Sequence, residues 1–157
     1  MSDLRIFHAM QRAHAALFRA ADRRFRAVEG ITASQLAVLF SLAGEDGVPI
    51  SAIAGQLKMG KSSLTGLIDR MTILDLVRRE KNDADARSQL VFIQPRGRRI
   101  LDRSTRETRA INEALLAPFN ADERALIAHF LDHIATNADG IVEDTEPEAE
   151  TEPEGIS

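Results

Sequence analysis

The chain has 157 residues, enough for one domain with a real hydrophobic core, and contains no cysteine, which excludes disulfides, zinc–thiolate sites and thiol redox sensing. Its formal net charge is −4, but residues 143–157 carry seven acids and no base, so residues 1–142 have a net charge of +3. Residues 58–109 hold thirteen bases and seven acids, and this net charge of +6 is typical of a DNA-contacting surface.

Two helices are predicted at the start of the chain. Apolar residues recur at three- and four-residue steps over residues 3–28, and Gly30 follows as a helix terminator. The stretch Thr32-Ala33-Ser34-Gln35 is a capping box, which predicts a second helix that stops near Gly44. Glycine, acidic residues and proline then predict a loop over residues 44–49.

The middle of the chain predicts a helix-turn-helix followed by a hairpin. A short helix over residues 50–57 is followed by Lys58-Met59-Gly60, where glycine should supply the sharp reversal. The next helix spans residues 62–74. Its buried stripe is expected to be Leu64, Leu67, Ile68 and Met71. Residues 76–81 and 89–94 are rich in strand formers and joined by a polar tip.

The last third predicts two more helices and a tail. Pro95 starts a helix to about residue 117, and Asn120 caps a final helix to about residue 138. Beyond Glu143, glutamates alternate with Pro, Thr and Ala, which predicts disorder. The order of elements predicts a mainly α fold, a winged helix-turn-helix with long terminal helices and a two- to three-stranded β-wing. Neither a signal peptide nor a membrane-spanning run is recognisable, so we expect a soluble cytoplasmic protein.

Two motifs carry a resemblance to the multiple-antibiotic-resistance regulator (MarR) family of transcription factors. Residues 85–97, Asp-Ala-Arg-Ser-Gln-Leu-Val-Phe-Ile-Gln-Pro-Arg-Gly, resemble the wing signature of that family. Residues 65–71, Thr-Gly-Leu-Ile-Asp-Arg-Met, resemble its recognition-helix pattern. The chain departs from the family at Asp75, where glycine is usual, and at Ile93-Gln94, where Leu-Thr is usual. Asp tolerates left-handed backbone, so the turn at Asp75 should survive.

The resemblance implies a two-fold dimer, with residues 1–30 and 100–140 as the dimerisation region and residues 31–99 as the DNA-binding region. Residues 143–157 form an acidic tail outside the family core. The second helix of a helix-turn-helix places its N-terminal residues on base edges in the major groove. The candidates here are Lys61, Ser62, Ser63, Thr65, Gly66 and Arg70. Simple N-capping is the alternative role for the two serines.

The hairpin tip supplies the second half of the predicted interface. The resemblance implies that Arg87 enters the minor groove, while Asp85 orients it or pairs with another wing arginine such as Arg79. The alternative is a surface turn with an incidental ion pair. The phosphate candidates, which position the protein without specifying sequence, are Lys58, Arg78, Arg79, Lys81 and Ser88.

A ligand site is a further expectation from the resemblance, because relatives bind small aromatic or amphipathic compounds between the dimerisation helices and the DNA-binding lobe. Polar candidates for such a site are Arg12, His14, Ser41 and Arg99. The alternative is that His14 is an ordinary interface histidine. No cofactor and no metal are predicted.

These patterns favour a homodimeric, sequence-specific transcription regulator, a ligand-responsive repressor that binds double-stranded DNA at a pseudo-palindromic operator. A winged-helix protein-interaction module without specific DNA binding is the alternative, and the +6 middle region argues against it. An enzyme is not expected, because the sequence offers no nucleophile–base pair, no metal-ligand cluster and no phosphate-cradling loop.

Overall fold

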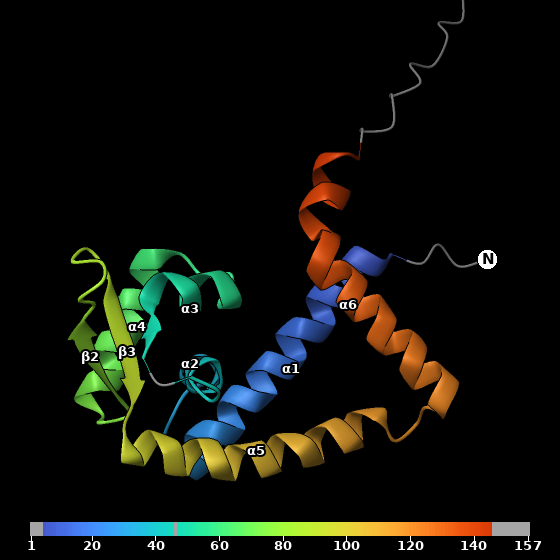
Figure 1. The fold of residues 1–157 in the computed structure, drawn as a ribbon. Helices are drawn as coiled ribbons and strands as arrows, with labels where there is room; N and C mark the ends of the chain where they lie inside the picture. Colours follow the sequence, from blue (N-terminus) through green and yellow to red (C-terminus); the bar gives the residue numbers. More distant parts are fainter. Residues whose placement is uncertain (1–4, 46, 146–157) are drawn as a thin grey trace, which may run out of the picture. The chain divides into compact units, whose positions relative to one another are not determined.

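The computed structural model describes residues 5–45 and 47–145 and shows a mainly helical chain with one small sheet (Figure 1). In chain order, the elements are α1 (Ile6–Glu29), α2 (Ala33–Ser41), β1 (Val48–Pro49), α3 (Ile50–Leu57), α4 (Lys61–Ile73), β2 (Val77–Lys81), β3 (Gln89–Ile93), α5 (Pro95–Leu116) and α6 (Ala121–Glu143). The predicted mainly α, winged helix-turn-helix fold is confirmed. The chain divides into two compact units, Met1–Arg109 and Ala110–Ser157, and each is described by itself.

The junction between α1 and α2 follows the predicted local chemistry. Gly30 takes a left-handed conformation, with φ of 70°, and its N–H donates to the Arg26 carbonyl at 3.1 Å. The capping box closes in both directions. The Gln35 N–H donates to Thr32 Oγ1 at 3.1 Å, and the Thr32 N–H donates to Gln35 Oε1 at 2.8 Å. The predicted start of the first helix, at residue 3, lies outside the described residues.

The turn between α3 and α4 differs from the prediction. Lys58, not Gly60, takes the left-handed conformation, with φ of 51°. Gly60 has φ of −63° and is the N-cap of α4, a position where glycine is well tolerated. The reversal therefore occurs directly at the end of α3, where the Lys58 N–H still bonds to helix carbonyls. The expectation that glycine supplies it was wrong.

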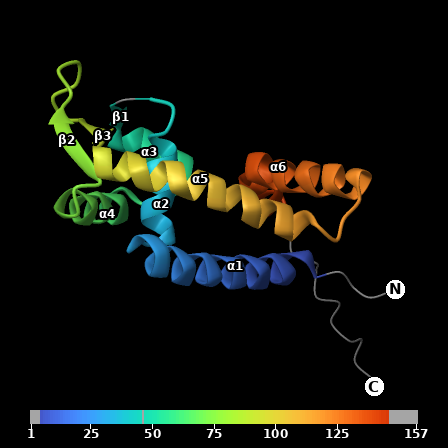
Figure 2. The same cartoon turned by 90° about the horizontal axis from the view of Figure 1, so that it is seen from below.

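The sheet has the strand order β1-β3-β2, with both pairings antiparallel. Val48 and Pro49, expected in a loop, form the edge strand β1 and pair with Val91 and Leu90 of β3. An edge strand tolerates proline because the missing N–H faces away from the partner strand. Val48 is buried by this pairing. In both ribbon views, α4 lies beside the β2–β3 hairpin, whose tip projects away from the helices (Figures 1 and 2).

Two backbone positions fix the hairpin between α4 and α5. Asp75 takes φ of 56°, so aspartate maintains the left-handed turn at the position where the family pattern has glycine. Gly97, in the first turn of α5, packs directly against the Leu76 carbonyl, and a Cβ at this position would overlap it. The Gln94 N–H donates to the same carbonyl oxygen at 2.9 Å. Glycine is therefore a packing requirement at position 97.

The core of the first unit is formed by α2, α3, α4, the sheet and the start of α5. The predicted stripe of α4 is confirmed as buried. Other fully buried apolar residues come from α2, α3, β2, β3 and the loops beside them: Ile31, Val38, Leu39, Leu42, Ile53, Leu76, Val77 and Val91. This core fixes the rotation of α4 about its axis and therefore decides which side chains of that helix face solvent.

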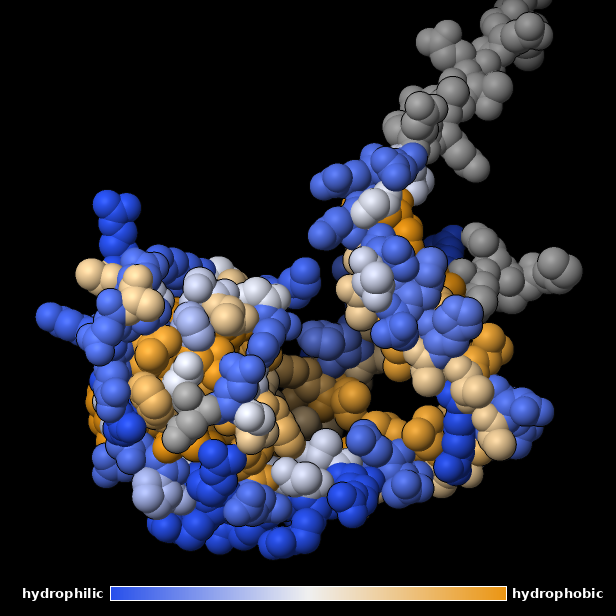
Figure 3. All heavy atoms as spheres, viewed as in Figure 1, coloured by the Kyte–Doolittle hydropathy of each residue, from blue (hydrophilic) through white to orange (hydrophobic). Residues whose placement is uncertain are grey.

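Helix α6 begins with the predicted capping box, in which Asn120 Oδ1 accepts from the Glu123 N–H at 3.0 Å and Glu123 Oε2 accepts from the Asn120 N–H at 2.9 Å. It continues to Glu143, five residues beyond the expected end, while residues 146–157 of the acidic tail lie outside the described residues. None of its residues is buried, and apolar patches are visible along it (Figure 3). Within residues 5–45 and 47–145, no helix is long and apolar enough to cross a membrane.

Candidate nucleic-acid interface

The start of α4 is left without a side-chain cap. Gly60 is the N-cap, and neither Ser62 nor Ser63 bonds back to the helix terminus. The N-capping role that the sequence left open for these serines is therefore excluded. Both side chains are exposed, and so is Lys61. The uncapped amides at the helix start carry partial positive charge and suit an anion such as a phosphate.

One flank of α4 shares a hollow with the wing. Lys61 and Thr65 from α4 lie in this hollow with Asp85, Arg87 and Ser88 from the hairpin. Its volume is about 340 Å³, and Ile50, Ser51 and Gln89 complete the lining. Side chains that lie twenty or more residues apart in the sequence therefore line one surface. We name it the wing-side hollow.

The hairpin tip is held in shape by its own polar groups. Asp85 Oδ1 accepts from the Arg87 N–H at 3.0 Å, and the Asp85 carbonyl accepts from the Ser88 N–H at 2.9 Å. Asn82 Oδ1 accepts from the Ala84 N–H at 3.0 Å. Asp85 thus orients Arg87 through the backbone, as an Asx-turn does. Among the described residues, no carboxylate pairs with the exposed Arg87 side chain.

The two arginines of β2 are engaged inside the chain. Arg79 forms an ion pair with Asp69 of α4, with Nη2 and Oδ1 2.5 Å apart, and not with Asp85 as one reading of the sequence allowed. Arg78 pairs with Glu80 and lies over the Phe92 ring, 4.3 Å from its centroid. The Asp69–Arg79 pair ties the recognition helix to the wing. The two partners lie ten residues apart on different elements, and no local spacing could have identified this pairing.

Two of the remaining interface candidates, Lys58 and Lys81, are exposed, and Gly66 is partly buried. Lys58 occupies the left-handed end of α3, and Lys81 ends β2. Gly66 lies mid-helix on α4, where a Cβ would meet nothing nearer than the Arg70 guanidinium at 3.8 Å. Packing within this chain therefore does not demand glycine at position 66. Because a glycine weakens a helix interior, its presence is consistent with close approach of a partner to the backbone.

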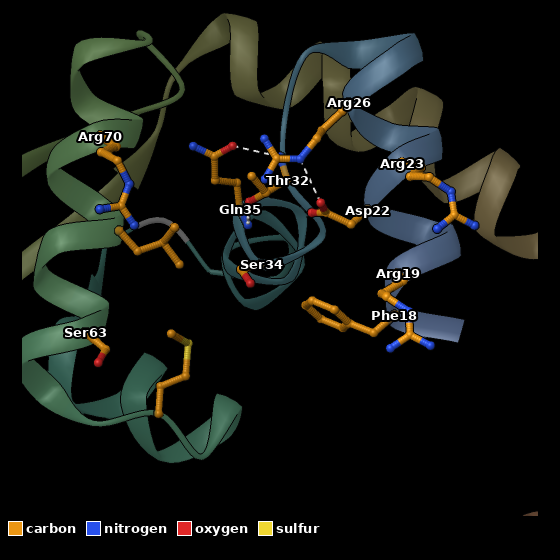
Figure 4. Close-up of a pocket in the computed structure, with 12 residues that line it drawn as sticks. Phe18, Arg19, Asp22, Arg23, Arg26, Thr32, Ser34, Gln35, Ser63 and Arg70 are labelled. Atoms are coloured by element: carbon orange, nitrogen blue, oxygen red, sulfur yellow. Dashed lines mark hydrogen bonds and ion pairs between the residues drawn. The ribbon is translucent and has the colours of Figure 1, made fainter. Parts of the chain in front are cut away.

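The opposite flank of α4 faces a second cleft, which we name the α1–α2–α4 cleft (Figure 4). Ser63, Leu67 and Arg70 line it from α4, and its volume is about 610 Å³. The other lining residues come from α1, α2 and the turn before α4: Phe18, Arg19, Asp22, Arg23, Arg26, Thr32, Ser34, Gln35 and Met59. None of the α1 residues of this cleft was a site candidate from the sequence, although Arg19, Arg23 and Arg26 recur at helical spacing.

Asp22 is the acidic group of that cleft. Its Oδ2 accepts from Arg26 Nε at 2.7 Å, and its Oδ1 accepts from the Ala33 N–H at 3.0 Å. The hydrogen bond from Arg26, followed by that from Ala33, lowers the pKa of Asp22 below its usual 3.8. Asp22 therefore caps α2 in its ionised form and offsets the charge of Arg26.

The four ligand-site candidates do not meet in either hollow. His14 is exposed and stacks on Phe18, with ring centroids 5.7 Å apart. The Ser41 hydroxyl donates to the Ala37 carbonyl at 3.2 Å. Arg12 lies in a shallow depression formed by α1 alone, and Arg99 is exposed on α5. Among the described residues, no group of three or more His, Asp or Glu side chains could hold a metal ion.

A family model described as the MarR family matches residues 29–88. The chain is 25% identical over 118 residues to YdgJ, an uncharacterized HTH-type transcriptional regulator of Bacillus subtilis (strain 168), covering 75% of this chain and 72% of that protein. It is 28% identical over 101 residues to the transcriptional regulator HosA of Escherichia coli O157:H7, covering 64% and 75% of the two chains.

The same fold occurs in the PcaV transcriptional regulator from Streptomyces coelicolor, solved in complex with its natural ligand. That structure has a TM-score of 0.75 and 23% identity and covers 86% of this chain and 94% of its own. The start of α4 and the hairpin tip both lie within the residues that the family model matches. Over residues 29–88 the chain is thus similar to the MarR family, and its fold is that of solved transcriptional regulators such as PcaV.

Proposed function

We propose that the protein is a homodimeric repressor that binds a pseudo-palindromic operator, with α4 in the major groove and Arg87 of the wing in the minor groove. The wing-side hollow carries this proposal, because it joins the start of α4 to the hairpin tip on one exposed surface. A helix fits the major groove, and an arginine suits the negative potential of a narrow minor groove. Asp85 pre-orients the tip, so less freedom is lost on binding.

Exposed apolar residues on both terminal helices support the dimer. Phe7 on α1 and Leu126 on α6 are each 68% exposed, and Leu131 is 53% exposed. Such apolar stripes gain free energy when a second copy covers them. We assign residues 1–30 and 100–140 to dimerisation and residues 31–99 to DNA binding. A two-fold dimer matches two half-sites about one helical turn apart.

We also propose a small aromatic or amphipathic effector and a cytoplasmic site of action. The solved complex of PcaV with its natural ligand supports the first point by analogy of fold. An effector would act by binding the two conformations of the dimer with different affinity. A complex with DNA that phenolic acids at millimolar concentration leave intact would contradict this part of the proposal.

The experiment is a binding titration with a duplex selected from a random library by the wild-type protein. Arg87→Ala should weaken binding by about 1–3 kcal/mol, roughly 5- to 150-fold. Arg106→Ala, an exposed arginine of α5 outside the interface, is the matched control and should leave Kd nearly unchanged. If Arg87→Ala bound the selected duplex as tightly as wild type does, the wing would have no role in DNA binding.

The salt dependence of DNA binding separates a DNA-binding protein from a protein-interaction module, and the mass in solution separates a dimer from a monomer. A DNA-binding dimer should show a steep negative slope of log affinity against log salt, since phosphate contacts release counterions. A protein-interaction module without specific DNA binding would bind no selected duplex more tightly than a scrambled one. Sedimentation at micromolar concentration should give a dimer, and a stable monomer would remove the basis for the palindromic operator.

A further inference from the structure

We propose that the α1–α2–α4 cleft is a second phosphate-binding surface, which holds the DNA backbone on the side of the recognition helix away from the wing. This inference rests on the proposed function, since it requires α4 to enter the major groove. It assigns a binding role to Arg19 and Arg23 of α1, and the occupant is the sugar–phosphate backbone, independent of base sequence.

A helix in the major groove, about 12 Å wide, lies between the two phosphate backbones that border it. Each flank of α4 must therefore face one backbone. One flank, with Lys61 and Thr65, opens to the wing-side hollow. The other flank, with Ser63 and Arg70, opens to the α1–α2–α4 cleft, so this cleft lies where the second backbone would pass.

Three of the arginines that line the cleft carry a charge that no acidic group in the described part of the chain offsets. Among the described residues, no ion pair or side-chain hydrogen bond engages Arg19, Arg23 or Arg70, whereas Arg26 is offset by Asp22. Figure 4 shows Arg70 on α4 and the two α1 arginines on opposite sides of the cleft, with Ser34 of α2 between them. Three uncompensated guanidinium groups around one opening favour an anionic partner.

The exposure of these arginine side chains distinguishes a polyanion from a small acid as the ligand of the cleft. Arg19, Arg23 and Arg70 are exposed, and the Arg26 side chain is 61% exposed. A small ligand is buried over roughly 70–90% of its surface by its site, and an exposed ion pair contributes little to the affinity for such a ligand. A DNA backbone needs no burial, because each neutralised phosphate adds its share of counterion release. Exposed cations along a groove flank therefore suit DNA better than a small acid.

The test uses the full-length protein, the duplex selected from a random library and a scrambled duplex of equal length. The double variant Arg19→Gln/Arg23→Gln should bind both duplexes about tenfold more weakly than wild type, and the salt slope should fall by about four, because each protomer of the dimer loses two charges. Arg106→Gln removes a charge from an exposed position of α5 outside the cleft. It should change Kd less than twofold. Melting curves of all variants should match wild type.

A second measurement identifies the partner atoms. Neutral methylphosphonate linkages, placed one at a time along the strand that borders the half-site away from the wing, should weaken wild-type binding at one or two positions. The same linkages should have no effect on Arg19→Gln/Arg23→Gln, because the charged partner is already absent. Linkages that weaken both proteins equally would place the cleft outside the complex and overturn the proposal.

Other outcomes separate this inference from the proposed function. Wild-type affinity and an unchanged salt slope in the double variant, beside a weakened Arg87→Ala, would overturn only the second surface. Binding of benzoate in calorimetry that the double variant loses, with DNA affinity intact, would assign the cleft to a small acid and also overturn it. A wild-type protein without affinity for any duplex would overturn both.

Discussion

Helices α4 and α6 both carry aliphatic residues at helical spacing, yet their environments are opposite. In α4, Leu64 and Ile68 are fully buried under α2, α3 and the sheet. In α6, no residue is buried, and Leu126 is 68% exposed. The same kind of periodicity thus describes a helix packed in the core of its own unit and a helix whose apolar face is left open. Periodicity predicts the stripe and says nothing about which chain covers it.

The largest difference between the two helices should appear when a leucine is truncated in each. Leu64→Ala should cost about 3 kcal/mol of unfolding free energy at every protein concentration, because it removes buried methyl groups and leaves a cavity. Leu126→Ala should cost under about 0.5 kcal/mol in dilute protein, as exposed positions do. In concentrated protein it should weaken dimerisation.

Urea denaturation at several protein concentrations, paired with sedimentation, measures both effects. If Leu126→Ala destabilised the dilute protein as much as Leu64→Ala, the stripe of α6 would have to be packed within its own chain. The comparison between the two helices would then fail.

Two helical glycines allow a second test, with a smaller expected effect. Gly97→Ala should cost about 2 kcal/mol, because the new Cβ overlaps the Leu76 carbonyl and lies 3.1 Å from Ile93 Cγ1. Gly66→Ala has open space and should stabilise the fold by about 0.5–1 kcal/mol, since alanine is the better helix former.

The same Gly66→Ala variant should bind the selected duplex more weakly, because the methyl group stands between α4 and the groove. Thermal melting measures the expected gain in stability of this variant, and a binding titration on the same preparation measures the expected loss of DNA affinity. A variant that is both more stable and equally tight would show that position 66 does not approach the DNA.

What could be predicted from the sequence is what depends on neighbours along the chain. The capping boxes that start at Thr32 and Asn120, the left-handed Gly30 and the left-handed Asp75 each need only a few consecutive residues, and each was predicted correctly. The buried stripe of α4 followed from periodicity in the same way. Local hydrogen bonding and local sterics are strong enough to decide these features.

The features that were missed depend on contacts between distant residues. Strand β1 exists because Val48 pairs with Val91, and a two-residue strand leaves no pattern of its own. The Asp69–Arg79 pair and the α1–α2–α4 cleft need the relative placement of separate elements. Lys58 took the conformation expected of glycine, since the end of α3 fixes where the chain turns. For the interface, the candidate residues were predictable, while their pairing was not.

In the winged region, Arg79 of β2 is paired with Asp69, whereas no carboxylate among the described residues pairs with Arg87 at the hairpin tip. Asp69→Asn releases Arg79 and should cost at most ~1 kcal/mol of stability, because Asp69 is half-exposed. It should strengthen binding to a scrambled duplex through the added positive charge, but it loosens the tie between α4 and the wing. The preference for the selected duplex should therefore fall.

Glu80→Gln is the matched control for Asp69→Asn. It releases Arg78 and adds the same charge, but Glu80 lies on the same strand as its partner and ties no helix to the wing. Its preference for the selected duplex should stay near wild type. Equal loss of preference in the two variants would attribute the effect to charge alone, and the Asp69–Arg79 pair would have no positioning role.

The smallest expected effect concerns the cap between α1 and α2. Because the folded pKa of Asp22 lies below its ordinary 3.8, its ionised form stabilises the fold above that pH, and this contribution is lost as pH falls through the lowered folded value. Asp22→Asn keeps an oxygen that can accept from the Ala33 N–H, but it removes the negative charge that faces the Arg26 guanidinium. Wild type should therefore melt slightly above Asp22→Asn at neutral pH, and the difference should shrink below pH 3.8. Asp102→Asn, an exposed acid of α5, controls for the change in net charge. A difference between wild type and Asp22→Asn that persists unchanged at low pH would mean that Asp22 acts through shape alone.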